Sequence, residues 1–581
     1  MKRVLALVLC LLMLVPMMAS CGQKDENDKG AIIQMYLATD VFNFDPIYAY
    51  TDDAASRIMG MIYEGLFRIN ADNGKVENAL CKKWEIVEDP EDDIYKARVT
   101  INDTAWSDGR KVSVDDVIYA WKRILDPEFS HPAAAMLFEI KNAKAYKNGD
   151  CSPDDVGLYA VDTTVMEIQF EKPIDYDLFK ERLCAPVLVP VREDAVGKLD
   201  KWASNVAVMV ANGPFRISSF RPGDTMILQR NAYYYRNEEK DALDKTVKPY
   251  RIYIDLTKSA EEQYQLTGDT VFFNSELPLS VRASLGKKDF KYVDSGSVHT
   301  YYFNTNNPLF ADANVRKALS LALDRQAIAD LVVFADPATG LIDNSVYNTS
   351  RKNSFREEGG ELIASSANVA EAKALLDAAG VRGGSFTITI RDNEVDNAIA
   401  EYAQGVWREL GFSVSIKPLG SESGYSPKKD PITEYDYFVD KFETAFNSGD
   451  FDVAAIDLQM FSTDAFGTLA QYAVGFSGTA IDLGNPNDWF EKPGITGYNS
   501  EEYNQYITEA YEAVDRKTKT EKLHSAEAVL MNDMPVMPLL FMKNAYTSSK
   551  KLSKFTFDYY GCPQFAKAKL KNYEEYTNVG K

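Results

Sequence analysis

The chain has 581 residues and a formal net charge of −22 at pH 7. This length exceeds the size at which one hydrophobic core stops growing, so we expect two or more domains, and a hydrophobic content of 45% excludes wholesale disorder. A surface this acidic repels phosphate, which argues against nucleic acid as a partner.

The first twenty residues have the pattern of a secretory signal peptide. Lys2 and Arg3 precede the apolar run VLALVLCLLMLVPMM, and the small residues Ala19 and Ser20 lead to Cys21. A basic start, a short apolar run and small residues before a cut are typical of such signals, and the run is short for a membrane span. The residues before Cys21 resemble a bacterial lipobox, which implies that Cys21 becomes the acylated N-terminus. An ordinary signal peptide with a chance cysteine is the alternative.

Acylation of Cys21 would hold the protein at a membrane without a transmembrane helix. The following stretch GQKDENDKG is polar and suits a flexible tether. Next along the chain, AIIQMYLAT (31–39) predicts a strand, and FNFDP ends it with a proline turn.

The segment SVDDVIYAWKRILDP, from Ser113 to Pro127, predicts a helix. Ser113 is placed to cap the N-terminus, and Asp116 can complete a capping box. Proline ends the helix after Asp126. One buried stripe is expected from the helical spacing of Val117, Ile118, Trp121, Ile124 and Leu125.

Strand and turn signals surround this helix in the first half of the chain. YKARVTI (95–101) and TTVMEIQFEKP (163–173) predict strands of a mixed sheet. Between Asn212 and Asn237, a Gly-Pro entry and a Pro-Gly-Asp turn flank two apolar runs, which predicts a hairpin.

The second half alternates strands with helices. Residues 313–332 predict one amphipathic helix, and two further helices are expected to end at Gly380 and Gly411. SFTITI (385–390), SVSIKPL (413–419) and FDVAAIDLQ (451–459) predict strands. This alternation favours an α/β domain with parallel strands. Because no long linker is visible, we expect short crossings between the lobes.

Motifs of catalysis are missing from the sequence. His131, His299 and His524 are isolated, and no HExxH, GxSxG, P-loop or GxGxxG motif is present. Carboxylate pairs such as Asp115-Asp116 are expected by chance among 86 acidic residues. We therefore expect no enzyme, no cofactor and no metal. Scattered cysteines leave a disulfide possible but not assignable among Cys81, Cys151, Cys184 and Cys562.

Four segments in a fixed order carry a family resemblance. They are IYEGLFRINADNGKVENALCKKW, TAWSDGRKVSVDDVIYAWKRILDP, NGPFRISSF with RNAYYY, and YYFNTNNPLFADANVRKALSLALDRQAI. In this order they resemble the family of extracellular solute-binding proteins that feed peptide importers. The resemblance extends from about Asp45 to about Leu570, and the lipobox agrees with it.

The resemblance implies two α/β lobes of the periplasmic-binding-protein type II, in the three-domain variant with an extra subdomain in the first lobe. Hinge crossings join the lobes, and the helix after Ser113 is scaffold in the subdomain. The expected bounds are 1–20 for the signal peptide, 21–30 for the lipidated tether, 31–65, 196–299 and 542–581 for lobe 1, 66–195 for the extra subdomain, and 300–541 for lobe 2.

By the same resemblance, the protein captures oligopeptides outside the cytoplasm and delivers them to the permease subunits of an ATP-driven (ABC) importer. Closure of the lobes is the conformational step. We expect a monomer on the outer face of the cell membrane. Peptide binders of this family hold the ligand backbone as an added strand between wet pockets. The expected walls are Tyr48, Tyr50 and Thr51 in a strand after Asp45-Pro46, and Asp457, Leu458, Gln459, Met460 and Phe461 opposite.

One departure from the family pattern concerns the ligand. Peptide-binding relatives commonly read FDVAxxGWxADYxDP, where the Asp of ADY receives the α-ammonium group. This chain reads FDVAAIDLQMFSTDAF, so Phe461 stands at the anchor position and Leu458 replaces the tryptophan. Either Asp464 or Asp457 takes over the ammonium group, or the anchor is absent. In the second case the ligand is a longer or blocked peptide, or another solute such as an oligosaccharide; a secreted hydrolase is the remote alternative.

Overall fold

A computed structural model describes residues 30–37, 41, 43–48, 50, 52–197, 202–221, 223–234, 246–285, 290–425, 436–479 and 492–576. The predicted signal peptide, Cys21 and Thr51 lie outside these residues. Within them, no helix combines the length and the apolar character that a membrane span requires. The four cysteines Cys81, Cys151, Cys184 and Cys562 carry free thiols.

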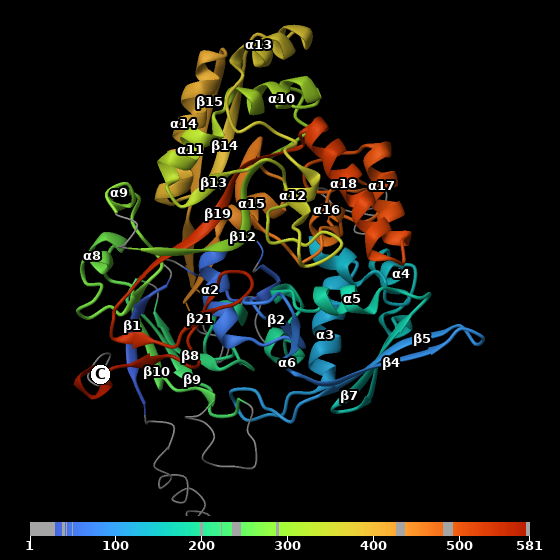
Figure 1. Ribbon diagram of the computed structural model, residues 1–581, viewed down its shortest axis with the longest axis vertical. Coiled ribbons are helices and arrows are strands. Elements are labelled where there is room, and N and C mark those ends of the chain that lie inside the picture. Colours follow the sequence, from blue (N-terminus) through green and yellow to red (C-terminus); the bar gives the residue numbers. More distant parts are fainter. Residues whose placement is uncertain are drawn as a thin grey trace, which may run out of the picture.

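One sheet of eleven strands extends through the whole molecule (Figure 1). In spatial order its strands are β15 (Phe412–Leu419), β14 (Gly384–Arg391), β18 (Val453–Gln459), β12 (Lys291–Phe303), β19 (Val536–Ser548), β11 (Phe273–Asn274), β1 (Ile32–Tyr36), β10 (Arg251–Asp255), β9 (Thr225–Arg230) and β8 (Phe215–Arg221), with β13 (Ala335–Pro337) beside β19.

The two longest strands, β12 and β19, join the two ends of this sheet. At the start of β19, Val536 pairs with Tyr302 of β12, which also pairs with β18. At the end of β19, Ser548 pairs with Phe273 of β11. A register shift of β12 between Asp294 and Val298 marks the middle of the crossing. These strands are crossings of the kind that the sequence predicted. Below, the first lobe denotes residues 30–285 and 549–576, and the second lobe denotes residues 304–535; the domain bounds given above stay a prediction.

The first lobe carries the strands β1 and β8 to β11 and a separate four-stranded antiparallel sheet in the order β4-β5-β7-β6. The predicted hairpin is present as β8 and β9. The other strands of the first lobe are β2 (Phe67–Ile69), β3 (Val76–Asn78), β4 (Cys81–Asp89), β5 (Ile94–Ile101), β6 (Leu158–Asp162), β7 (Val165–Phe170), β20 (Leu552–Ser553), β21 (Thr556–Phe557), β22 (Pro563–Gln564) and β23 (Lys569–Leu570). Its helices are α2 (Asp53–Ile62), α3 (Val114–Leu125), α4 (Ala143–Lys147), α5 (Tyr176–Arg182), α6 (Glu193–Val196), α8 (Ala260–Gln265) and α9 (Leu279–Arg282).

In the second lobe, β14 runs parallel to β15 and to β18, as predicted. β18 is antiparallel to β12, and β12 is antiparallel to β19, because one crossing strand enters this lobe and the other leaves it. Helices cover this end of the sheet (Figure 1). The described helices of the second lobe are α10 (Ala313–Ala322), α11 (Arg325–Val332), α12 (Phe355–Gly359), α13 (Val369–Ala378), α14 (Glu394–Glu409), α15 (Lys441–Asn447), α16 (Phe466–Ala470), α17 (Glu501–Glu512) and α18 (Arg516–Asp533). The lobe also contains the hairpin of β16 (Ser421–Tyr425) and β17 (Asp436–Asp440).

The prediction of one helix over residues 313–332 is wrong, because the segment forms α10 and α11. Leu323 is extended, and the carboxylate of Asp324 caps α11 by accepting the N–H of Ala327 at 2.8 Å. The buried guanidinium of Arg325 donates back to the carbonyl and the hydroxyl of Ser320 at 3.3 and 2.7 Å. These bonds satisfy polar groups at the end of α10, so the break is stable.

The helices α13 and α14 end where the glycines predicted. Gly380 and Gly411 follow the C-caps with φ angles of +68° and +97°. This region of φ is open to glycine and strained for other residues, so each glycine can close its helix in the left-handed conformation.

The helix α3 forms as its sequence predicts, and its cap serves a second purpose. The Asp116 carboxylate accepts hydrogen bonds from the N–H of Ser113 and from Nε1 of Trp106, both at 2.9 Å. Trp106 and Asp116 are both buried. A single carboxylate therefore joins the start of α3 to the turn that precedes it.

Replacing Asp116 by Ala is expected to lower the free energy of unfolding by about 1–3 kcal/mol, because the buried Nε1 of Trp106 loses its acceptor. Loss of the cap adds to this effect. Denaturant unfolding followed by tryptophan fluorescence measures it. Asp115→Ala is the matched control, because Asp115 lies in the same helical turn but is exposed. Equal stability of the two variants would contradict the prediction.

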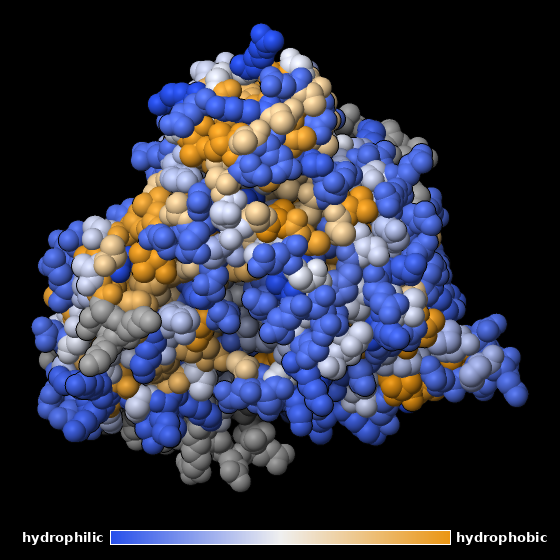
Figure 2. All heavy atoms as spheres, turned by 45° about the horizontal axis from the view of Figure 1, so that its top comes forward, coloured by the Kyte–Doolittle hydropathy of each residue, from blue (hydrophilic) through white to orange (hydrophobic). Residues whose placement is uncertain are grey.

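Figure 2 shows a mostly hydrophilic face on which apolar side chains form separate patches. Large exposed apolar residues among those described come from several distant elements: Ile86, Val87, Tyr159, Val161, Tyr292, Leu331, Val369 and Val514.

Candidate functional site

The two predicted walls come into direct contact between the lobes. The carbonyl of Tyr50 accepts a hydrogen bond from the N–H of Gln459 at 3.0 Å. The rings of Tyr50 and Phe461 lie 5.1 Å apart, and Leu458, Gln459, Met460 and Phe461 are buried. The structure thus brings together Tyr50, the end of β18 and the residues that follow it.

The prediction of a strand after Asp45-Pro46 is wrong for the residues described, because Pro46–Tyr48 form a 3-10 turn. The cause is Asp45, whose carboxylate accepts the N–H of Ile47 at 3.4 Å while its carbonyl accepts the N–H of Tyr48 at 3.0 Å. Asp45 is in turn held by Arg123 of α3 through two hydrogen bonds of 3.0 and 2.7 Å. The helix α3 therefore positions the turn that carries Tyr48.

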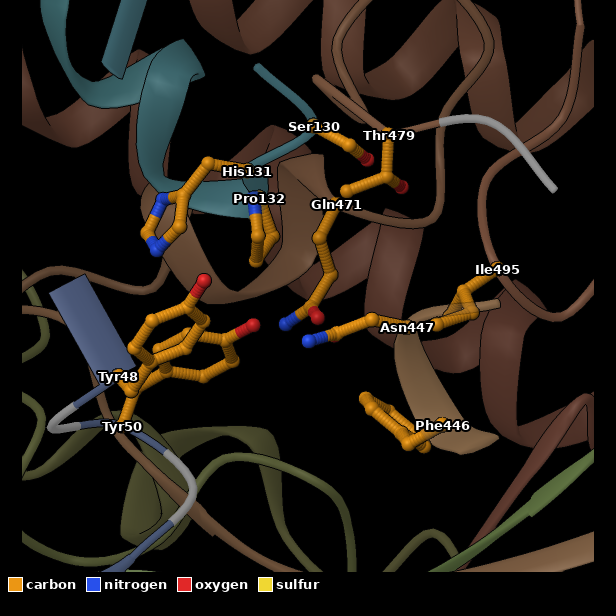
Figure 3. A pocket seen from close by; sticks show the side chains of 10 residues that line it. All are labelled: Tyr48, Tyr50, Ser130, His131, Pro132, Phe446, Asn447, Gln471, Thr479 and Ile495. Atoms are coloured by element: carbon orange, nitrogen blue, oxygen red, sulfur yellow. The ribbon is translucent and has the colours of Figure 1, made fainter. Parts of the chain in front are cut away.

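A cavity of about 30 Å³ lies between the lobes beside this turn (Figure 3). This is room for only a few atoms. Sequence reasoning identified Tyr48 and Tyr50 as site residues but missed the other lining residues, which have no motif. From the first lobe the lining takes Tyr48, Tyr50, Ser130, His131 and Pro132; from the second lobe it takes Phe446, Asn447, Gln471, Thr479 and Ile495.

His131 is a neutral member of this lining. Its Nδ1 accepts the N–H of Ala133 at 3.2 Å, so Nε2 carries the proton and donates to the carbonyl of Ile47 at 2.7 Å. Burial lowers the pKa of His131 to about 3. The ring meets Tyr50 edge-on at 5.3 Å. His131 thus fixes the turn before Tyr50 without adding charge.

Asp464, one of the two residues expected to receive an ammonium group, is engaged by the protein itself. Nε of Arg182 donates to its carboxylate at 2.6 Å, and Nη1 of the same guanidinium donates to Glu139 at 3.0 Å. Lys519 pairs with Glu139 at 2.8 Å. Arg182 is fully buried, so these pairs are shielded from water. Asp464 is therefore occupied in this closed arrangement.

The neighbouring Glu181 extends the same contact between the lobes. Its carboxylate accepts hydrogen bonds from Thr463 at 2.6 Å, from Arg516 at 3.0 Å and from Arg351 at 3.1 Å. We call these groups the interlobe ion network. Its members are Glu139, Glu181 and Arg182 of the first lobe, and Arg351, Asp464, Arg516 and Lys519 of the second lobe.

Asp457, the other expected anchor, pairs with His299. The two residues face each other on β18 and β12, and Nδ1 of His299 lies 2.7 Å from Oδ1 of Asp457. Burial alone would lower the pKa of His299, but the adjacent Asp457 carboxylate outweighs it, and the pKa is raised. Asp457 keeps 27% of its side chain exposed, whereas Asp464 keeps 7%.

His299, Asp457 and Asp396 are the only described residues whose ligand atoms gather as in a metal site, within 4.8 Å of one another. Two donors on one tetrahedral Zn²⁺ stand roughly 3.3 Å apart, from metal–ligand distances of about 2.0 Å. The 2.7 Å between Nδ1 and Oδ1 is shorter and is that of a hydrogen bond. The short contact is therefore that of a hydrogen-bonded His–Asp pair.

Comparison with known proteins finds a matching family profile, two relatives and a solved structure of similar fold. The profile of the bacterial extracellular solute-binding proteins, family 5, matches residues 75–478. The dipeptide-binding protein DppE of Bacillus subtilis is 27% identical over 524 residues, covering 88% of this chain and 86% of DppE. The oligopeptide-binding protein OppA of the same organism is 24% identical over 556 residues, covering 91% of each chain.

Among solved structures, OppA of Listeria monocytogenes bound to peptide superimposes with a TM-score of 0.74 at 20% identity. The match covers 93% of this chain and 99% of that one. This likeness shows that the two chains share a fold.

Proposed function

Because the chain belongs to family 5 of the bacterial extracellular solute-binding proteins, we propose that it captures oligopeptides outside the cytoplasm and hands them to an ATP-driven importer. The family is one of binding proteins, so the site is expected to hold its ligand without covalent change. Conservation of fold along almost the whole of a peptide-bound structure supports this proposal.

The contact between Tyr50 and Gln459 carries the proposal. A carbonyl of one lobe and an N–H of the other point at each other across the closed cleft. When the lobes part, both groups lose their partner. An extended peptide has donors and acceptors on both edges and can bind to both groups as an added strand. We propose that the peptide backbone replaces this direct bond.

Closure is proposed to depend on the interlobe ion network, which joins the lobes beside the cleft. Binding energy from the peptide would favour the closed form, as in hinge closure around a ligand. We further propose that Cys21 carries a lipid anchor and that the protein works as a monomer on the outer face of the membrane. The lipobox is the support for the anchor.

Thermal unfolding of ligand-free protein tests the proposal. The protein without residues 1–21 is unfolded, dialysed and refolded to remove bound ligand. It is then heated with defined peptide pools of two to ten residues. A ligand at 100 times its Kd should add about 2.7 kcal/mol to the free energy of unfolding. Absence of any shift with every pool would overturn the proposal.

An oligosaccharide is the second candidate, favoured by the uncharged cavity in which two tyrosines meet two amides. Tyrosine rings bind sugar faces as readily as peptide side chains. Calorimetric titration with a panel of oligosaccharides separates the two candidates. Heat of binding from a sugar, with none from peptides, would favour the second.

A further inference from the structure

Four polar side chains from both lobes point into the interlobe cavity. Tyr48 and Tyr50 reach it from the first lobe, and Asn447 and Gln471 reach it from the second lobe (Figure 3). Nε2 of Gln471 is already bound to the carbonyl of Thr468 at 2.8 Å. Hydroxyl and amide groups thus meet in a space with room for only a few atoms.

Two of these groups have no hydrogen-bond partner among the residues described. Tyr50 is 6% exposed, and its hydroxyl makes no hydrogen bond to any residue described. The carboxamide of Asn447 likewise has no hydrogen bond within the described part of the chain. A ligand group that filled the cavity and bonded to both would replace water at these groups with direct hydrogen bonds, so it would be stabilised there.

Charge is missing from the lining. None of its ten residues is Asp, Glu, Lys or Arg, and its one histidine, His131, is neutral. Nearby, Asp45 is neutralised by Arg123. Glu443 lies one turn before Asn447 on α15, and its charge reaches Tyr48 and Tyr50. Burial raises the pKa of Glu443 to about 7, so it carries less than a full charge near neutral pH.

We propose that this cavity selects an uncharged, hydrogen-bonding group of the ligand, such as a carboxamide or a hydroxyl, and rejects ammonium and carboxylate groups. The inference rests on the proposed peptide-binding function. An ion entering the cavity would leave its water and meet no opposite charge in the lining. The pairing of Asp464 with Arg182 and of Asp457 with His299 is consistent with this selection.

The test uses synthetic pentapeptides of alanine, acetylated at the N-terminus and amidated at the C-terminus. Each position in turn carries Ser, Asn, Gln, Lys or Glu, and the Kd of each peptide is measured by calorimetry. At one position, Asn, Gln or Ser should bind at least tenfold more tightly than Lys or Glu. The preference for this residue over Ala should fall at least threefold in Tyr50→Phe, which removes one hydroxyl.

A second variant is designed to make the cavity prefer a cationic side chain over an uncharged one. Asn447→Asp adds a carboxylate to the lining, so Lys at the same position should gain at least tenfold in affinity. The matched controls are Tyr146→Phe, which removes a tyrosine hydroxyl outside the lining, and Asn532→Asp, which adds a charge on the surface of the second lobe. Both controls should keep the wild-type preference.

Two outcomes would overturn the inference alone. Equal binding of Lys, Glu and Asn at every position would show that the cavity does not select, and preference for Lys in the wild-type protein would show that Glu443 governs it. Failure of every pentapeptide to bind, together with the absence of any shift from the peptide pools, would overturn the proposed function, and this inference with it.

Discussion

Replacing Arg182 by Met is expected to lower the free energy of unfolding by about 3–5 kcal/mol, the usual cost of leaving buried charges without a partner. The guanidinium is fully buried and bonds both Glu139 and Asp464. Methionine preserves much of the side-chain volume but supplies no donor. Lys519 still reaches Glu139, whereas Asp464 keeps only hydrogen bonds from neighbouring groups such as the N–H of Phe466.

The measurement is denaturant unfolding together with small-angle scattering of the ligand-free protein. Because the broken pair joins the two lobes, the variant should also be more open. Arg68→Met is the matched control: Arg68 pairs with Glu77 at 3.3 Å, but 61% of its side chain is exposed. An exposed pair contributes less than about 1 kcal/mol. If both variants lost equal stability, the interlobe ion network would not be what holds the lobes together.

Replacing Gln459 by Pro is expected to weaken peptide binding at least tenfold while the protein stays folded. Proline removes the N–H that points across the cleft at Tyr50. Gln459 is the last residue of β18, and the next ladder bond to the β12 side comes from the N–H of Met460. Proline is tolerated at such a strand end, where its nitrogen faces away from the neighbouring strand. The substitution should therefore lower the affinity for the peptide and leave the fold intact.

Calorimetry with a bound peptide measures this loss, and circular dichroism checks the fold. The matched control is Gln459→Ala, which keeps the backbone N–H and changes only the side chain. Its affinity should stay well above that of the proline variant. Equal affinity of the two variants would mean that this backbone donor does not contact the ligand, and the added-strand mode would be wrong.

Local signals predicted much of the fold. The helix α3 formed with the predicted cap because Ser113 and Asp116 act within one turn of each other. Gly380 and Gly411 follow the ends of their helices because a single glycine can adopt the left-handed conformation there, which is also a local effect. The break at Leu323 was missed because Asp324 suits both a helix surface and an N-cap. Only the long-range burial of Arg325 against Pro538 decides between them.

The site was less accessible to sequence reasoning. Tyr50 and Phe461 were found through the family resemblance, and the structure places their rings in contact. Asn447 and Gln471 were missed because they carry no motif and reach the cavity only through the packing of two separate helices, at whose C-terminal ends they lie. The partner of Asp464 is likewise nearly three hundred residues away in the chain, at Arg182, so no spacing rule could reveal it.

Native mass spectrometry of what the protein carries tests the central claim most directly. The chain without residues 1–21 is expressed in a bacterial host, purified without denaturation, and its bound ligands are released and sequenced. The proposed function predicts a heterogeneous set of peptides that share a narrow range of lengths. An empty protein, or one that carries a single non-peptide mass, would contradict it.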